Sequence, residues 1–210
     1  GKLKEAELFQ RKAIELKPDY AIAHSNLGTI LKDLGKLKEA ELSTRQAIKI
    51  NPDFAKAHAN LGTILSGLGK LQAAFDSYLR VIEINRKDPN IYSFITEFLG
   101  DSDPSQLNKS KLINILNLLL ERNDIPHKEL TRVFNFIYRN EIISSLEKLD
   151  SDFSKIDLLL NKKIIINALK KINFQDIRLE KLLTNIRKYL CNKVTKNKEE
   201  ISDSELQFII

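Results

Sequence analysis

Asn26 and Asn60 are the two residues of this chain whose type and spacing point most clearly to chemistry, because they stand 34 residues apart in otherwise matching segments. Both segments are predicted to be helical, and asparagine is a poor residue for a helix interior. Its side-chain amide offers both a hydrogen-bond donor and an acceptor. A column of such amides can clamp the backbone of an extended peptide without reading its sequence. The alternative interpretation is that both amides bond the backbone of a neighbouring helix and set how the helices stack.

His24 and His58 repeat with the same spacing and invite a metal interpretation. Packed helices lie about 8–10 Å apart, so equivalent side chains on successive repeats rarely converge on one ion. No third ligand shares their phase, and the remaining histidine, His127, stands far away in the sequence. We therefore expect packing histidines rather than a metal site.

Motifs of the common enzyme classes do not occur in the sequence. It contains no glycine-rich phosphate loop after a strand, no clustered histidine and glutamate set, and no serine, histidine and aspartate arrangement. We therefore expect no catalytic residues, no cofactor and no enzymatic activity in this chain.

A 34-residue repeat determines which elements position these side chains. Residues 1–34 and 35–68 agree at 23 of 34 positions, and a third copy opens at Gly69. This period is typical of a helix–turn–helix solenoid unit. In one full unit the apolar spacing predicts helices over 21–34 and 37–50. We expect a left-handed helix end at Gly35, and the second helix to stop at Pro52.

Small residues recur at fixed positions of the repeat. Gly28 and Gly62 fall within the predicted first helices, where glycine costs about 1 kcal/mol relative to alanine. Ala40 and Ala74 recur in the same way in the second helices. Larger side chains at these positions would push the helices apart, so the pattern predicts close approach of the two helices in each unit.

This pattern resembles the tetratricopeptide repeat over residues 1–100. The residues that carry the resemblance are Leu27, Gly28, Leu31, Gly35, Leu37, Ala40, Ala47 and Pro52, then Leu61, Gly62, Leu65, Gly69, Leu71, Ala74 and Tyr78. Histidine stands at the family's usual tryptophan position in both units, and Arg86 replaces the closing proline. The resemblance implies an all-α chain with a right-handed helix–turn–helix solenoid of about two and a half repeats plus a degenerate helix.

In that family the first helices line a concave groove that takes extended peptides or helices of partner proteins. The matching positions imply a peptide-binding groove lined by Ser25, Asn26, Thr29, Lys32, Lys56, Asn60 and Thr63. The resemblance extends to the repeats of O-GlcNAc transferases, whose groove carries an asparagine ladder, and the ladder of this chain ends at Phe94. We therefore expect a non-catalytic scaffold that binds a protein or peptide.

Residues 101–210 are predicted to form an irregular α-helical domain without the repeat. Asp103 and Gln106 predict a capped helix from Leu107 to Glu121, and a cation site at Asp101 and Asp103 is the less favoured alternative. Pro126 opens a further predicted helix, and the apolar segment 164–172 is expected to be central. Capping boxes at 154–157 and 202–205, and a long helix over 176–193, complete the prediction.

The second half is similar to the helical region that precedes S-adenosylmethionine-dependent methyltransferase domains in bacterial tetratricopeptide proteins. The segments that carry this similarity are DIRLEKLLT at 176–184 and SDSEL at 202–206. The similarity implies an alternative function, in which the chain is an accessory substrate-docking region of a larger methyltransferase or glycosyltransferase. The catalytic domain would then begin beyond Ile210.

Composition disfavours several other classes of partner. Residues 1–100 carry 15 basic and 12 acidic side chains and residues 101–210 carry 19 and 16, so the net charge of +6 is spread evenly. Because a nucleic-acid binder concentrates its basic charge, we expect no nucleic-acid partner. No apolar run reaches the length of about 18 residues that a membrane span needs. The single cysteine excludes an internal disulfide and fits a cytoplasmic protein.

The chain begins inside a repeat and contains no methionine, so we expect it to be a piece of a longer protein, cut at both ends. Residues 1–17 would be a second helix that lacks its first. Terminal repeats normally need caps. We therefore expect self-association through the uncovered apolar residues of this helix, which are Leu3, Ala6, Ala13 and Ile14.

Overall fold

The structure is a computed structural model that describes residues 1–147, 162–172, 184–188 and 191. Over these residues it is helical and contains no strand, as the sequence predicts. The chain divides into two compact units, residues 1–98 with 106–108, and residues 99–105 with those from 109 onward. The predicted capping boxes at 154–157 and 202–205, and most of the predicted helix over 176–193, lie outside the described residues.

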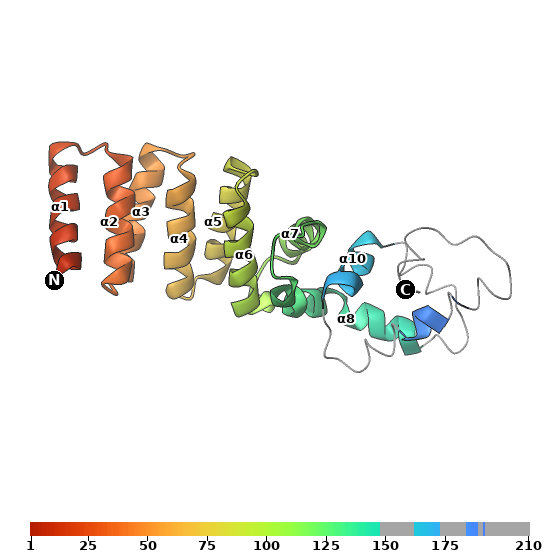
Figure 1. Cartoon of the computed structure of the whole chain (residues 1–210). Coiled ribbons are helices and arrows are strands. Elements are labelled where there is room, and N and C mark those ends of the chain that lie inside the picture. Colours follow the sequence, from red (N-terminus) through yellow and green to blue (C-terminus); the bar gives the residue numbers. More distant parts are fainter. Residues whose placement is uncertain (148–161, 173–183, 189–190, 192–210) are drawn as a thin grey trace. The chain divides into compact units, whose positions relative to one another are not determined.

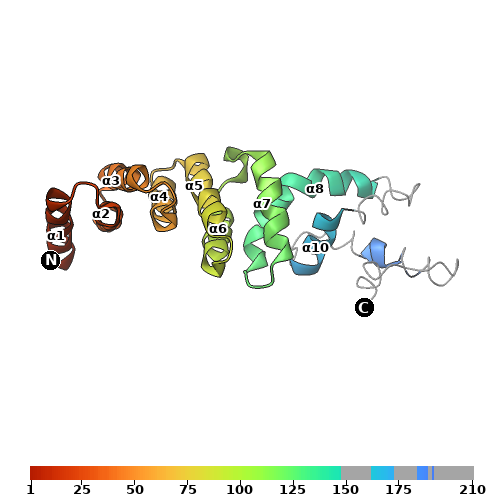
Figure 2. The same ribbon diagram turned by 90° about the horizontal axis from the view of Figure 1, so that it is seen from above.

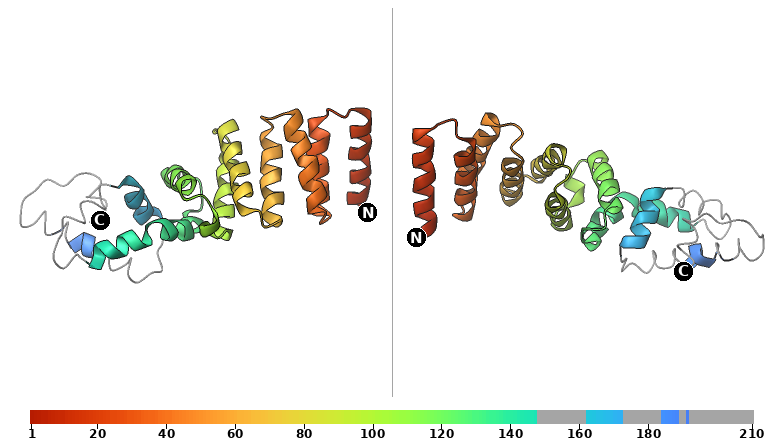
Figure 3. Two further views of the ribbon diagram at one scale, coloured as in Figure 1. Left: turned by 180° about the vertical axis from the view of Figure 1, so that it is seen from behind. Right: turned by 45° about the horizontal axis from the view of Figure 1, so that its top comes forward.

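The first unit is built from helices that stand side by side in chain order (Figure 1). Their bounds are α1 Lys2–Leu16, α2 Ala21–Asp33, α3 Leu37–Ile50, α4 Ala55–Gly67, α5 Leu71–Ile84 and α6 Pro89–Asp101. Seen from above, α2, α4 and α6 lie in one layer while α3 and α5 lie in the other (Figure 2), and the view from behind shows the same stack (Figure 3). Each 34-residue repeat is therefore one helix hairpin in a two-layered solenoid.

A glycine in the left-handed conformation makes the turn within each hairpin. Gly35 and Gly69 have φ angles of 76° and 72°, which favour glycine. The backbone N–H of Lys36 donates to the carbonyl of Leu31 at 2.8 Å, and the next repeat has the same contact at 2.9 Å. These bonds satisfy carbonyls at the helix end. The left-handed helix end predicted at Gly35 is confirmed.

The two helices of each hairpin approach closely at a glycine. A β-carbon at Gly62 would lie 2.8 Å from the ring of Tyr78, and one at Gly28 would lie 2.1 Å from Thr44 Oγ1. Neither position has room for a side chain as the neighbours stand. The alanines at the matching positions of the second helices are fully buried, namely Ala40 and Ala74. The predicted close approach is therefore confirmed.

Ion pairs join successive second helices. The carboxylates and their partners are Glu7 with Arg11 and Lys36, and Glu41 with Arg45 and Lys70, at 2.7–3.1 Å. The Arg11 guanidinium, with help from Lys36, holds the pKa of Glu7 below its ordinary value, and Lys70 does the same for Glu41. One repeat further on the position holds Phe75, which is fully buried with its ring stacked 6.3 Å from that of Phe98. The charged contact is thus replaced by an aromatic one where the repeat decays.

The large apolar residues that the first helix of the chain exposes include Leu3 from the predicted set, but not Ile14. Ile14 packs against the core that contains Leu27 and Leu31, because α2 covers this side of α1. The expectation that Ile14 is uncovered is therefore wrong. The large apolar residues that α1 exposes are Leu3 at 42%, Leu8 at 67%, Phe9 at 70% and Leu16 at 79%.

The second unit contains η1 Pro104–Gln106, α7 Lys109–Glu121, η2 His127–Leu130, α8 Thr131–Glu147 and α10 Lys163–Lys171. Its buried side chains include Leu112, Leu116, Leu119, Leu130, Val133, Phe134, Ile165 and Ala168. The apolar segment 164–172, which is expected to be central, contributes buried side chains to this unit. None of the helices in the described ranges is both long and apolar enough to cross a membrane.

The predicted helix start at Leu107 is wrong. Asp103 does cap a helical turn, because its carboxylate accepts from the backbone N–H and the hydroxyl of Ser105 at 3.0 and 2.8 Å. That turn is only the short η1. The backbone N–H of Asn108 then donates to Oε1 of Gln72 at 2.7 Å, so it does not take part in a helical hydrogen bond. The regular helix α7 therefore begins at Lys109.

Candidate binding face

Asn60 ties α4 to α2 through two hydrogen bonds between side chains. Its Nδ2 donates to Thr29 Oγ1 at 2.9 Å and to Ser25 Oγ at 3.2 Å. Thr29 donates its own hydroxyl hydrogen to the carbonyl of Ser25 at 3.2 Å, so its oxygen can only accept from Asn60. This chain of bonds determines that the nitrogen of the Asn60 amide faces α2. Its Oδ1 atom has no hydrogen-bond partner in the part of the chain that the structure describes.

Asn26 holds the equivalent position of α2 and is half-buried like Asn60. No described helix precedes α2 in its layer, and among the described residues the Asn26 amide has no hydrogen-bond partner. Among the described residues, the two asparagines therefore differ in their hydrogen-bond partners. Asn60 sets how α4 stacks on α2, as one of the two sequence interpretations proposed, although its partners are side chains rather than helix backbone.

The hydroxyl residues of the predicted groove take supporting positions. Ser25 is fully buried, so it positions the Asn60 amide and cannot itself meet a ligand. Thr29 is half-buried and does the same from the next turn of α2. Thr63 is exposed, and its hydroxyl donates to the carbonyl of Ala59 and lies 3.2 Å from the hydroxyl of Tyr78.

The two lysines of the predicted groove differ in their partners. The ammonium of Lys32 lies 3.2 Å from the carboxylate of Asp33, so its charge is already paired. Lys56 is exposed and makes no ion pair within the described ranges. Lys56 is therefore the unpaired cation of the predicted groove.

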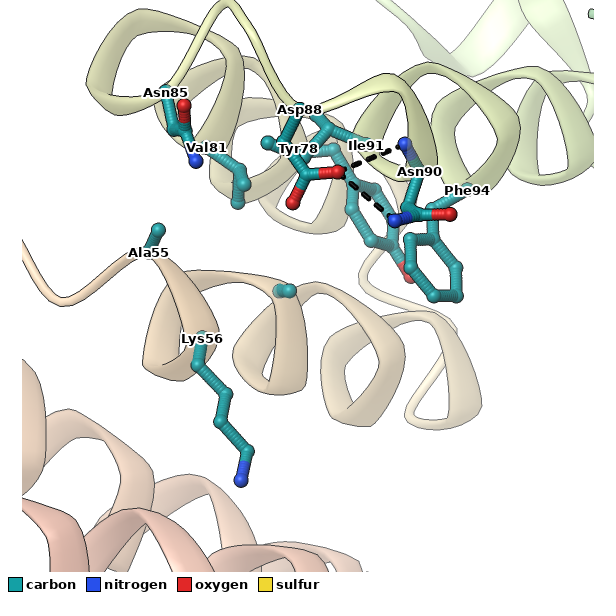
Figure 4. Close-up of a pocket in the computed structure, with 10 residues that line it drawn as sticks. Ala55, Lys56, Tyr78, Val81, Asn85, Asp88, Asn90, Ile91 and Phe94 are labelled. Carbon is teal, nitrogen blue, oxygen red and sulfur yellow. Dashed lines mark hydrogen bonds between the residues drawn. The ribbon is translucent and has the colours of Figure 1, made fainter.

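A cavity of about 350 Å³ opens between α4, α5 and α6 (Figure 4). Ala59, which precedes Asn60 in the sequence, is part of its lining. Its apolar lining consists of Ala55, Ala59, Tyr78, Val81, Ile91 and Phe94, and its polar rim of Lys56, Asn85, Asp88 and Asn90. In Figure 4, the Lys56 side chain extends from α4 away from Tyr78 and Phe94. Of these lining residues, only Lys56 is among the binding residues predicted from the sequence. In that prediction Phe94 marks the end of the asparagine ladder.

Two changes of residue within the repeat distinguish this junction from the one before it. Counted by the 34-residue period, Ala59 replaces Ser25 and Phe94 replaces Asn60. Neither replacement can form the amide-to-hydroxyl bonds that tie α4 to α2. These two departures from the repeat were the signal in the sequence that could have located the cavity.

Tyr78 forms part of the cavity lining and stays uncharged. Burial raises the pKa of its phenol and the carboxylate of Glu97 adds to this, while the hydrogen bond between its hydroxyl and that of Thr63 acts in the opposite direction. Its ring also packs 5.2 Å from that of Phe98. The cavity therefore has a neutral wall that two contacts hold in place.

The histidines of the repeat bind the turn that precedes each first helix. A ring nitrogen of His24 lies 2.9 Å from the carbonyl oxygen of Pro18, and one of His58 lies 2.8 Å from that of Pro52. At the same position of the next repeat, the hydroxyl of Tyr92 donates to the carbonyl of Arg86 at 2.9 Å. These bonds give each ring a structural partner. Among the described residues, no three side chains of the metal-binding types gather into a group.

Comparison with protein families gives two matches, both to the tetratricopeptide repeat. One covers residues 21–54, which form α2 and α3 with their turns, and the other covers residues 44–76. No curated protein matches the sequence.

The solved structures to which the chain is similar include the following two proteins. One is YrrB, described as a tetratricopeptide repeat protein with an unusual peptide-binding site, at 14% identity over 95% of this chain and 88% of that one, with a TM-score of 0.43. The other is pilF of Pseudomonas aeruginosa, at 20% identity over 99% of this chain and 82% of that one, with a TM-score of 0.45.

Proposed function

We propose that the chain is a non-catalytic interaction scaffold that binds an extended peptide segment of a partner along α2 and α4. The match of residues 21–76 to the tetratricopeptide repeat supports a role in protein interaction. The observation that carries the proposal is the contrast between the two asparagines. Asn60 has a fixed amide with an open acceptor, and Asn26 has an amide with no partner among the described residues.

These two amides suit the backbone of a peptide. Every residue of an extended peptide other than proline carries one N–H donor and one C=O acceptor. Oδ1 of Asn60 can accept from one N–H, while Asn26 can both donate and accept. Because Ser25 and Thr29 already hold Asn60 in one orientation, little conformational freedom is lost there on binding. Backbone contacts of this kind supply affinity without sequence preference.

A selection from a random-peptide display library on the whole chain tests this function. We expect peptides to be enriched and expect Asn26→Ala to weaken their binding. Net hydrogen-bond energies predict a loss of about 1–2 kcal/mol, or about 5- to 30-fold in Kd. Isothermal titration calorimetry with one enriched peptide measures this loss.

The matched control is Gln46→Ala, which removes an exposed side-chain amide from the second helix α3. This variant is expected to bind the peptide as the unchanged chain does. Failure to enrich any peptide would count against the function. So would a peptide whose affinity is the same for the Asn26→Ala variant and the unchanged chain.

Self-association is a second candidate, because α1 exposes several large apolar residues. Phe9 and Leu16, at 70% and 79% exposure, are the most prominent. A helix face of this kind can pair with the same face of another copy. Light scattering over a concentration series is expected to show dimers that Phe9→Glu abolishes, and a monomer at every concentration would exclude the idea.

We expect this scaffold to act on proteins in a reducing compartment such as the cytoplasm, since its one cysteine leaves it without an internal disulfide. We expect neither nucleic acid nor membrane among its partners, because its positive charge is evenly spread. The alternative of a docking region within a larger transferase stays a prediction from the sequence.

A further inference from the structure

We propose that the cavity between α4, α5 and α6 is a specificity pocket that takes one large apolar side chain of the bound peptide, flanked by an acidic residue that pairs with Lys56. This inference rests on the proposed function, because it adds a side-chain preference to a peptide held by its backbone. The backbone contacts alone would leave the scaffold indifferent to sequence.

The lining of the cavity fits an apolar side chain. Tyr78, Val81 and Ile91 are buried, with 8%, 3% and 8% of their surface exposed, and form the apolar inner surface. Phe94 stands on α6 with 55% of its surface exposed, so part of its ring is open to solvent beside the cavity. The volume of about 350 Å³ falls at the small end of the range of about 300–1,000 Å³ for ligand pockets. An aromatic or long aliphatic side chain would cover Phe94 and exclude water from this surface.

The repeat itself explains why a cavity occurs at this junction. At the preceding junction, Asn60 crosses to α2 and donates to two hydroxyls. At this junction the position of Asn60 is held by Phe94 and that of Ser25 by Ala59, so polar bonds are replaced by apolar walls. Asp88 also stands where Phe54 stands one repeat earlier, which puts a smaller and charged side chain at the rim.

Charge gives the second part of the preference. Lys56 borders the cavity and its ammonium points away from the apolar lining (Figure 4). It makes no ion pair among the described residues, whereas the carboxylate of Asp88 already accepts from the backbone N–H and the side-chain amide of Asn90, both at 3.0 Å. A carboxylate next to the apolar residue of the peptide would find the free cation. It would lie beside the pocket rather than inside it.

The same random-peptide library tests the preference. Enriched peptides are expected to share a large apolar residue with Asp or Glu close to it, and replacing that apolar residue by alanine should weaken binding about 10- to 100-fold. Because the chain contains no tryptophan, Phe94→Trp places a single fluorescent reporter on the pocket wall. Its emission is expected to shift when the enriched peptide binds.

The sharpest variant is Ala59→Ser with Phe94→Asn, which gives this junction the residues of the preceding one. Thr63 already donates to the carbonyl of residue 59 as Thr29 does to that of residue 25, so a new amide at 94 would have two hydroxyl partners. We expect the double variant to fold, to replace the apolar wall of the pocket by polar side chains and to bind the enriched peptide about 10- to 100-fold more weakly. Phe94→Ala serves as a second variant, because the residue is largely exposed and its loss leaves the core intact.

Charge reversal examines the acidic residue separately. Lys56→Glu should weaken binding of a peptide with the acidic residue and not of its amide counterpart. Lys49→Glu is the matched control, since Lys49 is exposed on α3 and carries the same charge. Equal effects of the two reversals would overturn the proposed contact with Lys56.

Two results separate this inference from the function on which it rests. The first result is that enriched peptides bind Asn26→Ala more weakly but bind both pocket variants, the double variant and Phe94→Ala, with unchanged affinity. This result would refute the pocket and leave the scaffold function standing. Enriched peptides without a common apolar residue would likewise refute the pocket and leave the function intact. If no peptide is enriched, both proposals are overturned together.

Discussion

Replacing Asn60 and Asn26 by alanine, one at a time, should have opposite effects on stability although the residues are equivalent in the repeat. Asn60→Ala removes two hydrogen bonds, of 2.9 and 3.2 Å, and leaves the hydroxyl of Ser25 fully buried without its amide partner. A buried polar group left unpaired costs about 1–3 kcal/mol. Alanine regains at most about 0.7 kcal/mol of helix propensity. The free energy of unfolding should therefore fall by about 1–2 kcal/mol.

Asn26→Ala removes no hydrogen bond among the described residues and regains the same helix propensity. This variant should be unchanged or more stable by about 0.5 kcal/mol. Urea unfolding followed by far-ultraviolet circular dichroism measures both values. Adding Ser25→Ala to Asn60→Ala should recover part of the loss, because removing both partners leaves no orphaned group. Equal losses for Asn26→Ala and Asn60→Ala, or no recovery in the double variant, would refute the reasoning.

Three further predictions follow from the fold. Gly62→Ala should destabilise the chain by about 1 kcal/mol, because a β-carbon 2.8 Å from the Tyr78 ring forces repacking that outweighs the gain in helix propensity. Near-ultraviolet circular dichroism should show the tyrosine displaced, and an unaltered tyrosine signal would contradict this. Gly35→Ala should cost about 1–2 kcal/mol in urea unfolding purely through its φ of 76°, since no atom stands near its β-carbon position, and a neutral result would count against the left-handed turn. Lowering the pH below about 4.5 should destabilise the first unit, because the pKa values of Glu7 and Glu41 are lowered from 4.5 in the folded chain and the unfolded chain therefore binds protons first. The effect should be small because the basic partners are exposed. The thermal unfolding of the double variant Glu7→Gln, Glu41→Gln should lose this part of the pH dependence. An identical pH profile for the variant would show that the ion pairs contribute nothing to stability.

The repeat made the hairpins predictable because every local signal agreed. Helices expected over 21–34 and 37–50 occur at Ala21–Asp33 and Leu37–Ile50, with the left-handed turn at Gly35 between them. The glycines inside the first helices correctly indicated close contact, since glycine in a helix interior is unfavourable unless a neighbour needs the space. These features depend on neighbours within one repeat, which the period fixes.

The two roles of the asparagines could not be predicted in the same way. A period shows that Asn26 and Asn60 are alike, but a hydrogen bond depends on what stands on the neighbouring helix. Asn60 meets Ser25 and Thr29, whereas Asn26 has no described first helix before it. The helix start expected at Leu107 was wrong for a related reason. The cap at Asp103 was predicted correctly, but the long-range bond from Asn108 to Gln72 leaves no local trace in the sequence.

The cavity could not be predicted from the positions where the repeat is kept. It is formed where the repeat changes, at Ala59 and Phe94. Phe94 was taken as the end of a polar ladder, although an apolar residue on a binding face can itself be a contact. The volume of the cavity depends on how α4, α5 and α6 pack, which a single sequence does not specify.

The face formed by the first helices is proposed to bind the backbone of a peptide, and the side-chain amides of asparagine report on this most directly. Their nuclear magnetic resonance signals can be followed while an enriched peptide is added to the chain. We expect the Asn26 signals to move most, because its amide has no partner among the described residues before binding, and those of the Gln46 amide on α3 to stay in place. Saturation of the peptide with unmoved Asn26 signals would contradict backbone binding at this face.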